Sequence, residues 1–157
     1  MIVLGIDPGL ATCGWGVIAK EAGDYKHIEH GCIITKPEQS HHERLLQINQ
    51  ELLSLIKKYK PSTIAVEELF FYKNVKTAFK VGEARGVILL TAAQVGLPVR
   101  EYTPLQVKLA VTSYGRADKQ QIQKMVKVLL KLDEIPKPDD TADALAIAMT
   151  CIQSREF

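Results

Sequence analysis

Acidic side chains stand next to the most apolar segments of this 157-residue chain. Asp7 directly follows the apolar run IVLGI, and Glu67 follows the run TIAV. In the segment DDTADALAIAM, Asp143 lies one turn inside a stretch that is apolar on every side, which is typical of a buried helix. Asp140 precedes it by three residues, so both side chains lie on one helix face. Such a carboxylate, if unpaired, costs several kcal/mol or takes up a proton.

Most of these acids also have a plain structural explanation. The tripeptide DPG around Asp7 favours a turn, Glu67 can end a strand in solvent, and Asp139 or Asp140 can cap a helix. Asp143 has no such explanation. Carboxylates that converge without Cys or His suit a hard cation such as Mg²⁺ or Mn²⁺. Two such ions can stabilise the attacking and leaving oxygens of phosphodiester hydrolysis.

The apolar periodicity predicts an α/β fold with a five-stranded mixed sheet flanked by helices. Strands are expected at about 2–7, 14–18, 25–35, 63–67 and 98–102. Helices are expected after Ser40, from about 74 to 94, after Thr103, after Asp118 and from about 139. A right-handed crossover lays the fourth strand parallel to the first. Asp7 and Glu67 are then expected at neighbouring carboxyl ends, where open α/β sheets hold their sites.

Composition predicts a single domain over residues 1–157. The chain is 46% hydrophobic and 24% charged with a net charge of +2, which is ordinary for a globular protein. Its three cysteines are widely spaced, which favours neither a disulfide framework nor a zinc site and indicates the cytoplasm. The apolar stretch GVILLTAAQVGLPV is too short to span a bilayer, so we expect no membrane partner.

A basic and aromatic surface is predicted beside the acids. Lys73, Lys76 and Lys80 recur at helical spacing after the fourth strand. Between positions 105 and 132 the sequence has six basic residues and only one acidic residue. The basic residues are Lys108, Arg116, Lys119, Lys124, Lys127 and Lys131. Although a lysine stripe is commonly only a solvated face, this imbalance is typical of phosphate binding. The aromatic run FFY at 70–72 cannot all pack inward, and an exposed ring there can stack on bases.

Two further pairs carry weaker signals. His27 and His30 lie on a predicted strand, where a spacing of three places them on opposite faces and argues against a shared metal. Gly82 and Gly86 allow a close backbone approach to the long helix, either by the sheet or by a second subunit.

Five segments carry a resemblance to a known family. In chain order they are GIDPGLATCGWGVI, VEELFFYKN, VGEARGVILL, GRADKQQIQKMV and DDTADALAIAM. Together they closely resemble the RuvC family of Holliday-junction resolvases, over nearly the whole chain. The resemblance implies a ribonuclease-H-like fold, a homodimer and Mg²⁺, with two ions expected per active site. It also implies which residues are both catalytic and metal-binding: Asp7, Glu67, Asp140 and Asp143.

The resemblance also implies the DNA contacts and partners. Phe70 is the favoured aromatic wedge, and Lys108 and Lys119 match family positions that face DNA. The remaining DNA-binding candidates are Phe71, Lys73, Lys76, Lys80 and Arg116. Glu68 departs from the family, which more often has Gln there. The implied partners are four-way junction DNA, a second copy of the chain and the RuvA–RuvB branch-migration complex.

The predicted activity is that of a Mg²⁺-dependent crossover junction endodeoxyribonuclease. It would resolve four-way junctions in recombination and repair by two symmetric nicks, using metal-activated water and leaving 5′-phosphate and 3′-hydroxyl ends. One alternative is a ribonuclease-H-like relative of the YqgF type that acts on RNA, which FFYKN and GRADK disfavour. The other is an ATP-binding domain of the actin and hexokinase type, which shares an Asp-then-Gly-rich hairpin but needs a far longer chain.

Overall fold

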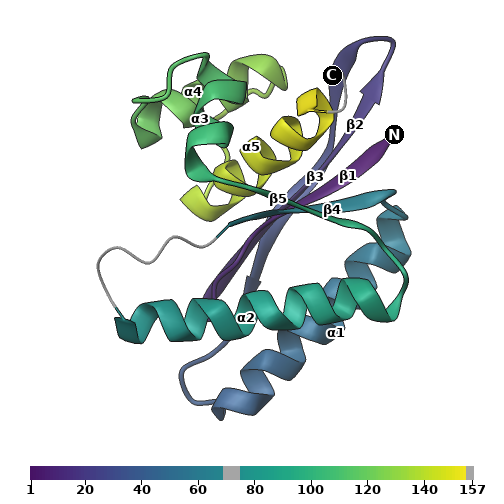
Figure 1. Cartoon of the computed structure of the whole chain (residues 1–157), viewed down its shortest axis with the longest axis vertical. Helices are drawn as coiled ribbons and strands as arrows, with labels where there is room; N and C mark the ends of the chain where they lie inside the picture. Colours follow the sequence, from purple (N-terminus) through teal and green to yellow (C-terminus); the bar gives the residue numbers. More distant parts are fainter. Residues whose placement is uncertain (69–74, 155–157) are drawn as a thin grey trace.

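A five-stranded sheet with helices on both faces forms the molecule (Figure 1). The computed structural model describes residues 1–68 and 75–154, with the side chains of 75–77 left out. The strands are β1 (Ile2–Asp7), β2 (Thr12–Glu21), β3 (Asp24–Ile34), β4 (Thr63–Glu67) and β5 (Val99–Tyr102). The helices are α1 (His41–Tyr59), α2 (Val75–Gln94), α3 (Pro104–Thr112), α4 (Lys119–Leu129) and α5 (Asp139–Gln153).

The sheet has the mixed topology that the sequence predicts. Its strand order is β3-β2-β1-β4-β5, in which β1, β2 and β3 form an antiparallel meander while β4 and β5 run parallel to β1. The β1–β4 register aligns Ile6 with Val66, so the residues that follow these two lie at one edge of the sheet. The predicted crossover is therefore confirmed. The first hairpin is longer than predicted, because β2 already begins at Thr12.

Two hydrophobic cores hold the helices to the sheet. On one face α1 and α2 pack through Ile48, Leu52 and Ile88, which are fully or almost fully buried. On the other face α5 lies directly on the strands, with α3 and α4 packed against it (Figure 1). The two layers leave the carboxyl ends of β1 and β4 between α5 and α2.

The helix starts agree with the capping residues read from the sequence, with one exception. Thr103 and Asp118 each accept a hydrogen bond from the backbone N–H three residues later. At α5, however, the residue before the helix is Pro138, and Asp139 and Asp140 are its first two residues. The plain structural explanation of Asp139 or Asp140 as an N-cap therefore does not hold, whereas the predicted helix start at about 139 is confirmed. Their carboxylates are free to interact with other elements.

A β-bulge overturns the prediction that His27 and His30 lie on opposite faces of the sheet. The β2–β3 register shifts between Val17 and Ile18, so that Val17 pairs with Glu29 and Ile18 pairs with His27. The extra residue on β3 brings the two imidazoles to the same face. Nε2 of His27 and Nδ1 of His30 are 2.8 Å apart and share a hydrogen bond.

Glycines on the sheet let α5 approach more closely than any side chain would allow. A Cβ atom added to Gly14 would lie 2.1 Å from the carbonyl oxygen of Asp140, and one added to Gly5 would lie 2.1 Å from that of Ala144. The helix is correspondingly buried, and Ala144–Ile152 are all nearly inaccessible to solvent. Even so, no helix within residues 1–68 and 75–154 is long and apolar enough to cross a membrane.

We predict that Gly14→Ala displaces the start of α5. The added methyl meets helix backbone rather than a flexible side chain, so the strain should cost at least about 1–3 kcal/mol of unfolding free energy. Urea unfolding measures this cost, and cleavage should fall further than the loss of folded protein explains. Gly23→Ala is the control, because Gly23 has a φ of 95° but no atom near its added Cβ. Equal effects of the two variants on cleavage would contradict the role of Gly14.

Candidate active site

Four carboxylates from three elements meet at the carboxyl end of β1 and β4. Asp7 and Glu67 are the last residues of these adjacent parallel strands. Asp140 and Asp143 lie in the first turn and a half of α5, which packs across β2, β1 and β4 on one face of the sheet. In the antiparallel register of β1 and β2, Asp7 pairs with Gly14. The Cα of Gly14 in turn lies against the backbone of Asp140. The missing side chain at Gly14 thus brings the helix start to the strand end.

Burial and mutual repulsion act strongly on these carboxylates. The pKa of Asp7 is raised to about 8, chiefly by burial and then by the charges of Asp143, Glu67 and Asp140, while Lys119 acts in the opposite direction. The pKa of Glu67 is likewise raised by burial and by the neighbouring Asp143. These effects place Asp7, Glu67 and Asp143 in one poorly solvated region, with the charge of Asp140 close enough to act on Asp7. Near neutral pH, Asp7 holds a proton unless positive charge offsets its neighbours.

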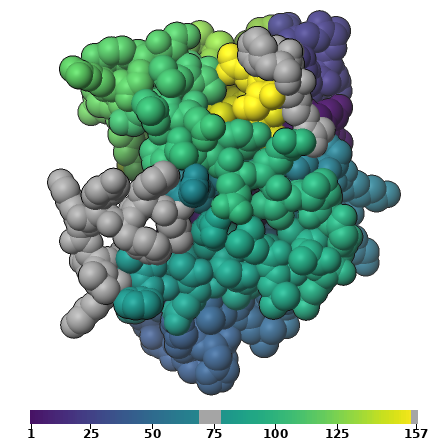
Figure 2. Space-filling model, viewed as in Figure 1, coloured from purple at the N-terminus to yellow at the C-terminus, as the bar shows by residue number. Residues whose placement is uncertain are grey.

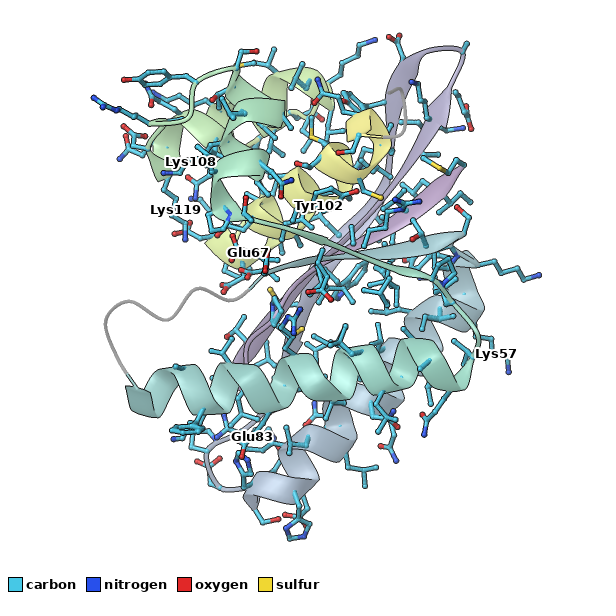
Figure 3. The ribbon with its side chains drawn as sticks, viewed as in Figure 1. Lys57, Glu67, Glu83, Tyr102, Lys108 and Lys119 are labelled. Atoms are coloured by element: carbon cyan, nitrogen blue, oxygen red, sulfur yellow. The ribbon has the colours of Figure 1, made fainter. Side chains whose placement is uncertain are left out.

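A small pocket opens onto three of the four acids. Asp7, Glu67 and Asp143 line a cavity of about 90 Å³ whose walls also include Lys108 from α3. Its apolar lining comes from α3, α4 and α5: Pro104, Val107, Ile122 and Ile147. Figure 3 shows Glu67, Lys108 and Lys119 gathered on this side of the molecule. The pocket therefore combines anionic groups, amines and a low-dielectric wall, which strengthens every electrostatic interaction inside it.

Lys119 connects α4 to α5 through two carboxylates. Its Nζ lies 3.2 Å from Asp143 Oδ2 and 3.4 Å from Asp139 Oδ2. Gln123 Nε2 donates a further hydrogen bond of 2.9 Å to Asp139 Oδ1. Burial raises the pKa of Asp143, and Lys119 partly counteracts that rise. The sequence indicates only a helix cap for Asp139, because nothing in the local pattern indicates a contact with α4.

The donor set fits a hard divalent cation. All four groups are carboxylates, and oxygen donors of this kind suit Mg²⁺ and Mn²⁺ rather than zinc or copper. Among the described residues, no three His, Cys, Asp or Glu side chains are positioned to hold one ion as they stand. Asp143 is instead directed to Lys119. To bind an ion, Asp143 would therefore have to exchange its ammonium partner for the cation, by rotation of a side chain that is 30% exposed.

The predicted DNA-binding residues are only partly brought together. Lys108 and Lys119 flank the pocket, whereas Lys80 is exposed on α2 and Arg116 is exposed between α3 and α4. The remaining predicted contacts lie outside the described residues, or have a side chain that does: Phe70, Phe71, Lys73 and Lys76.

The comparisons with known proteins agree with this arrangement. Residues 3–151 match the family described as crossover junction endodeoxyribonuclease RuvC. The chain belongs to the RuvC family. A relative from Thermosipho melanesiensis, named crossover junction endodeoxyribonuclease RuvC, is 57% identical over 148 residues, which cover 94% of each chain. Membership confirms the family resemblance that the five sequence segments carry.

Solved structures of the family confirm the fold. The structure of Thermus thermophilus RuvC superimposes with a TM-score of 0.90 at 39% identity, covering 99% of this chain and 96% of that one. The same protein in complex with a Holliday junction substrate gives a TM-score of 0.90 at 37% identity, with the same coverage. The predicted ribonuclease-H-like, mixed-sheet fold is therefore correct.

We predict that unfolding free energy, measured by urea in the presence of EDTA, declines as pH rises from about 5 to about 8. The folded protein retains a proton on Asp7 up to about pH 8, whereas the ordinary value of 3.8 means that the unfolded chain has already released it. Stability falls with pH wherever the folded state binds more protons. Asp7→Asn should make this decline shallower. An identical decline in both proteins would contradict the burial of Asp7 among like charges.

Proposed function

We propose that this chain is a divalent-metal-dependent endonuclease that resolves four-way DNA junctions by two symmetric nicks. The observation that carries the proposal is the meeting of Asp7, Glu67, Asp140 and Asp143 beside two lysines. In a RuvC-family chain, such a site suits phosphodiester hydrolysis. The relative from Thermus thermophilus, structurally similar over nearly the whole chain, has a Holliday junction as its substrate. Neither RNA nor ATP as a substrate has comparable support.

The four carboxylates would hold Mg²⁺ or Mn²⁺, with two ions per site. When bound, such ions lower the pKa of a water nucleophile and stabilise the leaving oxygen. Asp7 and Glu67 extend from strand ends, which position ligands more accurately than loops do. Asp7 must release its proton to bind a cation, so metal binding should release protons into solution.

Lys119 and Lys108 supply the positive charge that a phosphodiester backbone needs near this anionic pocket. The Lys119 side chain is half-exposed, so its ammonium group can turn from Asp143 to a DNA phosphate. That exchange also frees the Asp143 carboxylate for the cation. We therefore propose that phosphate binding and metal binding favour one another at this pair. Lys108 would contact the backbone from the α3 side of the pocket.

A second copy of the chain is proposed to dock on α2. Phe79 is 70% exposed and Leu90 is 58% exposed. Cβ atoms added to Gly82 or Gly86 would meet nothing within 4 Å. Their spacing of three or four residues places these four on one helix face. Figure 2 shows part of α2 at the surface of the molecule. Since the glycines do not serve contact with the sheet, they suit close approach by a second subunit.

A symmetric dimer also fits the reaction. Two strands of like polarity must be cut in a four-way junction, and an isologous pair presents two equivalent sites. We also propose the RuvA–RuvB branch-migration complex as a partner, because the family resemblance implies it.

We predict that the purified protein nicks a synthetic four-way junction, but not matched linear duplex, only when Mg²⁺ or Mn²⁺ is present. Asp143→Asn should abolish nicking while leaving junction affinity equal or slightly higher, because it removes a metal-binding oxygen and one negative charge. Asp139→Asn is the control, since Asp139 contacts the same lysine but is not among the four acids. Near-parental nicking by folded Asp143→Asn would contradict the proposed site.

We predict that Lys119→Ala weakens junction binding and makes it less salt-dependent. Loss of one phosphate contact should reduce the slope of log affinity against log salt by about one. Fluorescence anisotropy over a salt series measures this slope. Lys131→Ala provides a control, because Lys131 pairs with Asp24 away from the pocket. An unchanged slope in Lys119→Ala would remove this residue from the phosphate contacts.

We predict that Phe79→Glu or Leu90→Glu converts a dimer into a monomer of about half its mass by light scattering. A charge placed in an apolar contact is desolvated without a partner and opposes association. Val128→Glu is the control, since Val128 is 65% exposed on α4. Dimers of unchanged stability in both α2 variants would place the interface elsewhere.

A further inference from the structure

Beyond the four acids, Arg85 is the side chain most closely tied to the strand end that carries Glu67. It lies three turns into α2, and its side chain is largely buried, at 18% exposure. Nε donates a hydrogen bond of 3.4 Å to the backbone carbonyl oxygen of Glu67. Another guanidinium nitrogen forms an ion pair with the Glu101 carboxylate on β5. One planar group thus joins α2, β4 and β5.

From this geometry we propose that Arg85 is a positioning residue that fixes the backbone of Glu67, and through it the direction of the Glu67 carboxylate. The inference rests on the proposed function, in which Glu67 is a metal ligand. Arg85 does not line the pocket or contact its carboxylates in any described interaction. It acts on the site through the peptide group that carries Glu67.

The strand end needs such support because the sheet gives it little on the β1 side. The parallel register of β1 and β4 ends at the pair Ile6 and Val66. Two residues beyond Ile6, just after the end of β1, is Pro8, which has no backbone N–H to extend the ladder. On the β5 side the ladder continues for one more bond, in which the Glu68 N–H donates to the Tyr102 carbonyl oxygen at 2.8 Å. Arg85 supplies the donor for the Glu67 carbonyl.

Glu101 keeps the guanidinium group in the orientation that this contact requires. Its carboxylate is paired with Arg85, and it lies beside Val66 in the β4–β5 register. A planar guanidinium with several fixed N–H directions can serve both partners at once, whereas an ammonium group is a compact point charge without that fork. The chemistry therefore favours arginine over lysine at this position.

The same residue links the site to the proposed subunit surface. Arg85 directly precedes Gly86, and the two side-chain positions point to different sides of α2, one toward the strands and one toward solvent. In Figure 1, α2 runs alongside the layer that contains β4 and β5. A shift of α2 on association would therefore move the group that holds Glu67.

The test measures metal binding and cleavage separately in Arg85→Ala, Arg85→Lys and Glu101→Gln. Calorimetry with Mn²⁺ and no DNA reports the metal site directly. Single-turnover cleavage of a four-way junction over a Mn²⁺ series then gives the maximal rate and the half-saturating ion concentration. Arg100→Ala is the matched control, because Arg100 is an exposed arginine on β5 next to Glu101. Melting temperature and junction affinity are recorded for every variant.

We expect Arg85→Ala to lower the maximal rate by about tenfold to a hundredfold, because displacement of a reacting group by about 1 Å has an effect of that size. Mn²⁺ affinity should fall while junction affinity changes by less than about twofold, since no phosphate contact is lost. Arg85→Lys should restore only part of the rate, and Glu101→Gln should show a weaker form of the same defect. Arg100→Ala should behave like the parent.

Two results would overturn the inference. One is a folded Arg85→Ala protein with parental Mn²⁺ affinity and a parental half-saturating concentration, even if its melting temperature falls, because that pattern describes packing alone. The other is full rescue of cleavage by Arg85→Lys together with parental cleavage and Mn²⁺ binding in Glu101→Gln. The planar geometry of the guanidinium group would then have no role. A parent protein that binds Mn²⁺ but does not cut junctions would refute the proposed function instead, and the calorimetric comparison of Arg85→Ala would still decide the inference.

Discussion

The close contact between α5 and the glycine-bearing face of the sheet is the constraint on which the rest of the structure depends. At Gly14 and Gly5 a single added carbon would collide with helix backbone, so the helix can lie here only because side chains are absent. This contact buries the apolar part of α5 and fixes its axial position. Asp140 and Asp143 consequently reach the strand ends where Asp7 and Glu67 already lie.

The second consequence of that contact is electrostatic. Helix and strands together exclude water from carboxylates that repel one another, and the pKa of Asp7 rises to about 8 as a result. Such a site is unfavourable for folding and favourable for cation binding, because an ion relieves repulsion that the fold itself creates. Lys119 offsets part of the charge from outside.

Much of this site could be predicted from the sequence, because its main features follow from short-range rules. The crossover rule places Asp7 beside Glu67, and the all-round apolar helix marks Asp143 as unusual. Features that depend on contacts between distant segments could not be predicted. No local signal pairs Gly14 with Asp140, or directs Arg85 to the Glu67 backbone, and the β-bulge that joins the two histidines arises from an irregular register with β2. Family resemblance supplied the activity, which spacing alone left open.

The central claim, that the four carboxylates form one cation site, is tested most directly by anomalous X-ray scattering from a crystal grown with Mn²⁺. The account predicts anomalous density bounded by Asp7, Glu67, Asp140 and Asp143, with Asp143 turned away from Lys119. The same experiment on Asp7→Asn should show that density weakened or absent. Mn²⁺ bound elsewhere in the parent crystal, with the Asp143–Lys119 ion pair intact and no density between the strand ends and α5, would contradict the account.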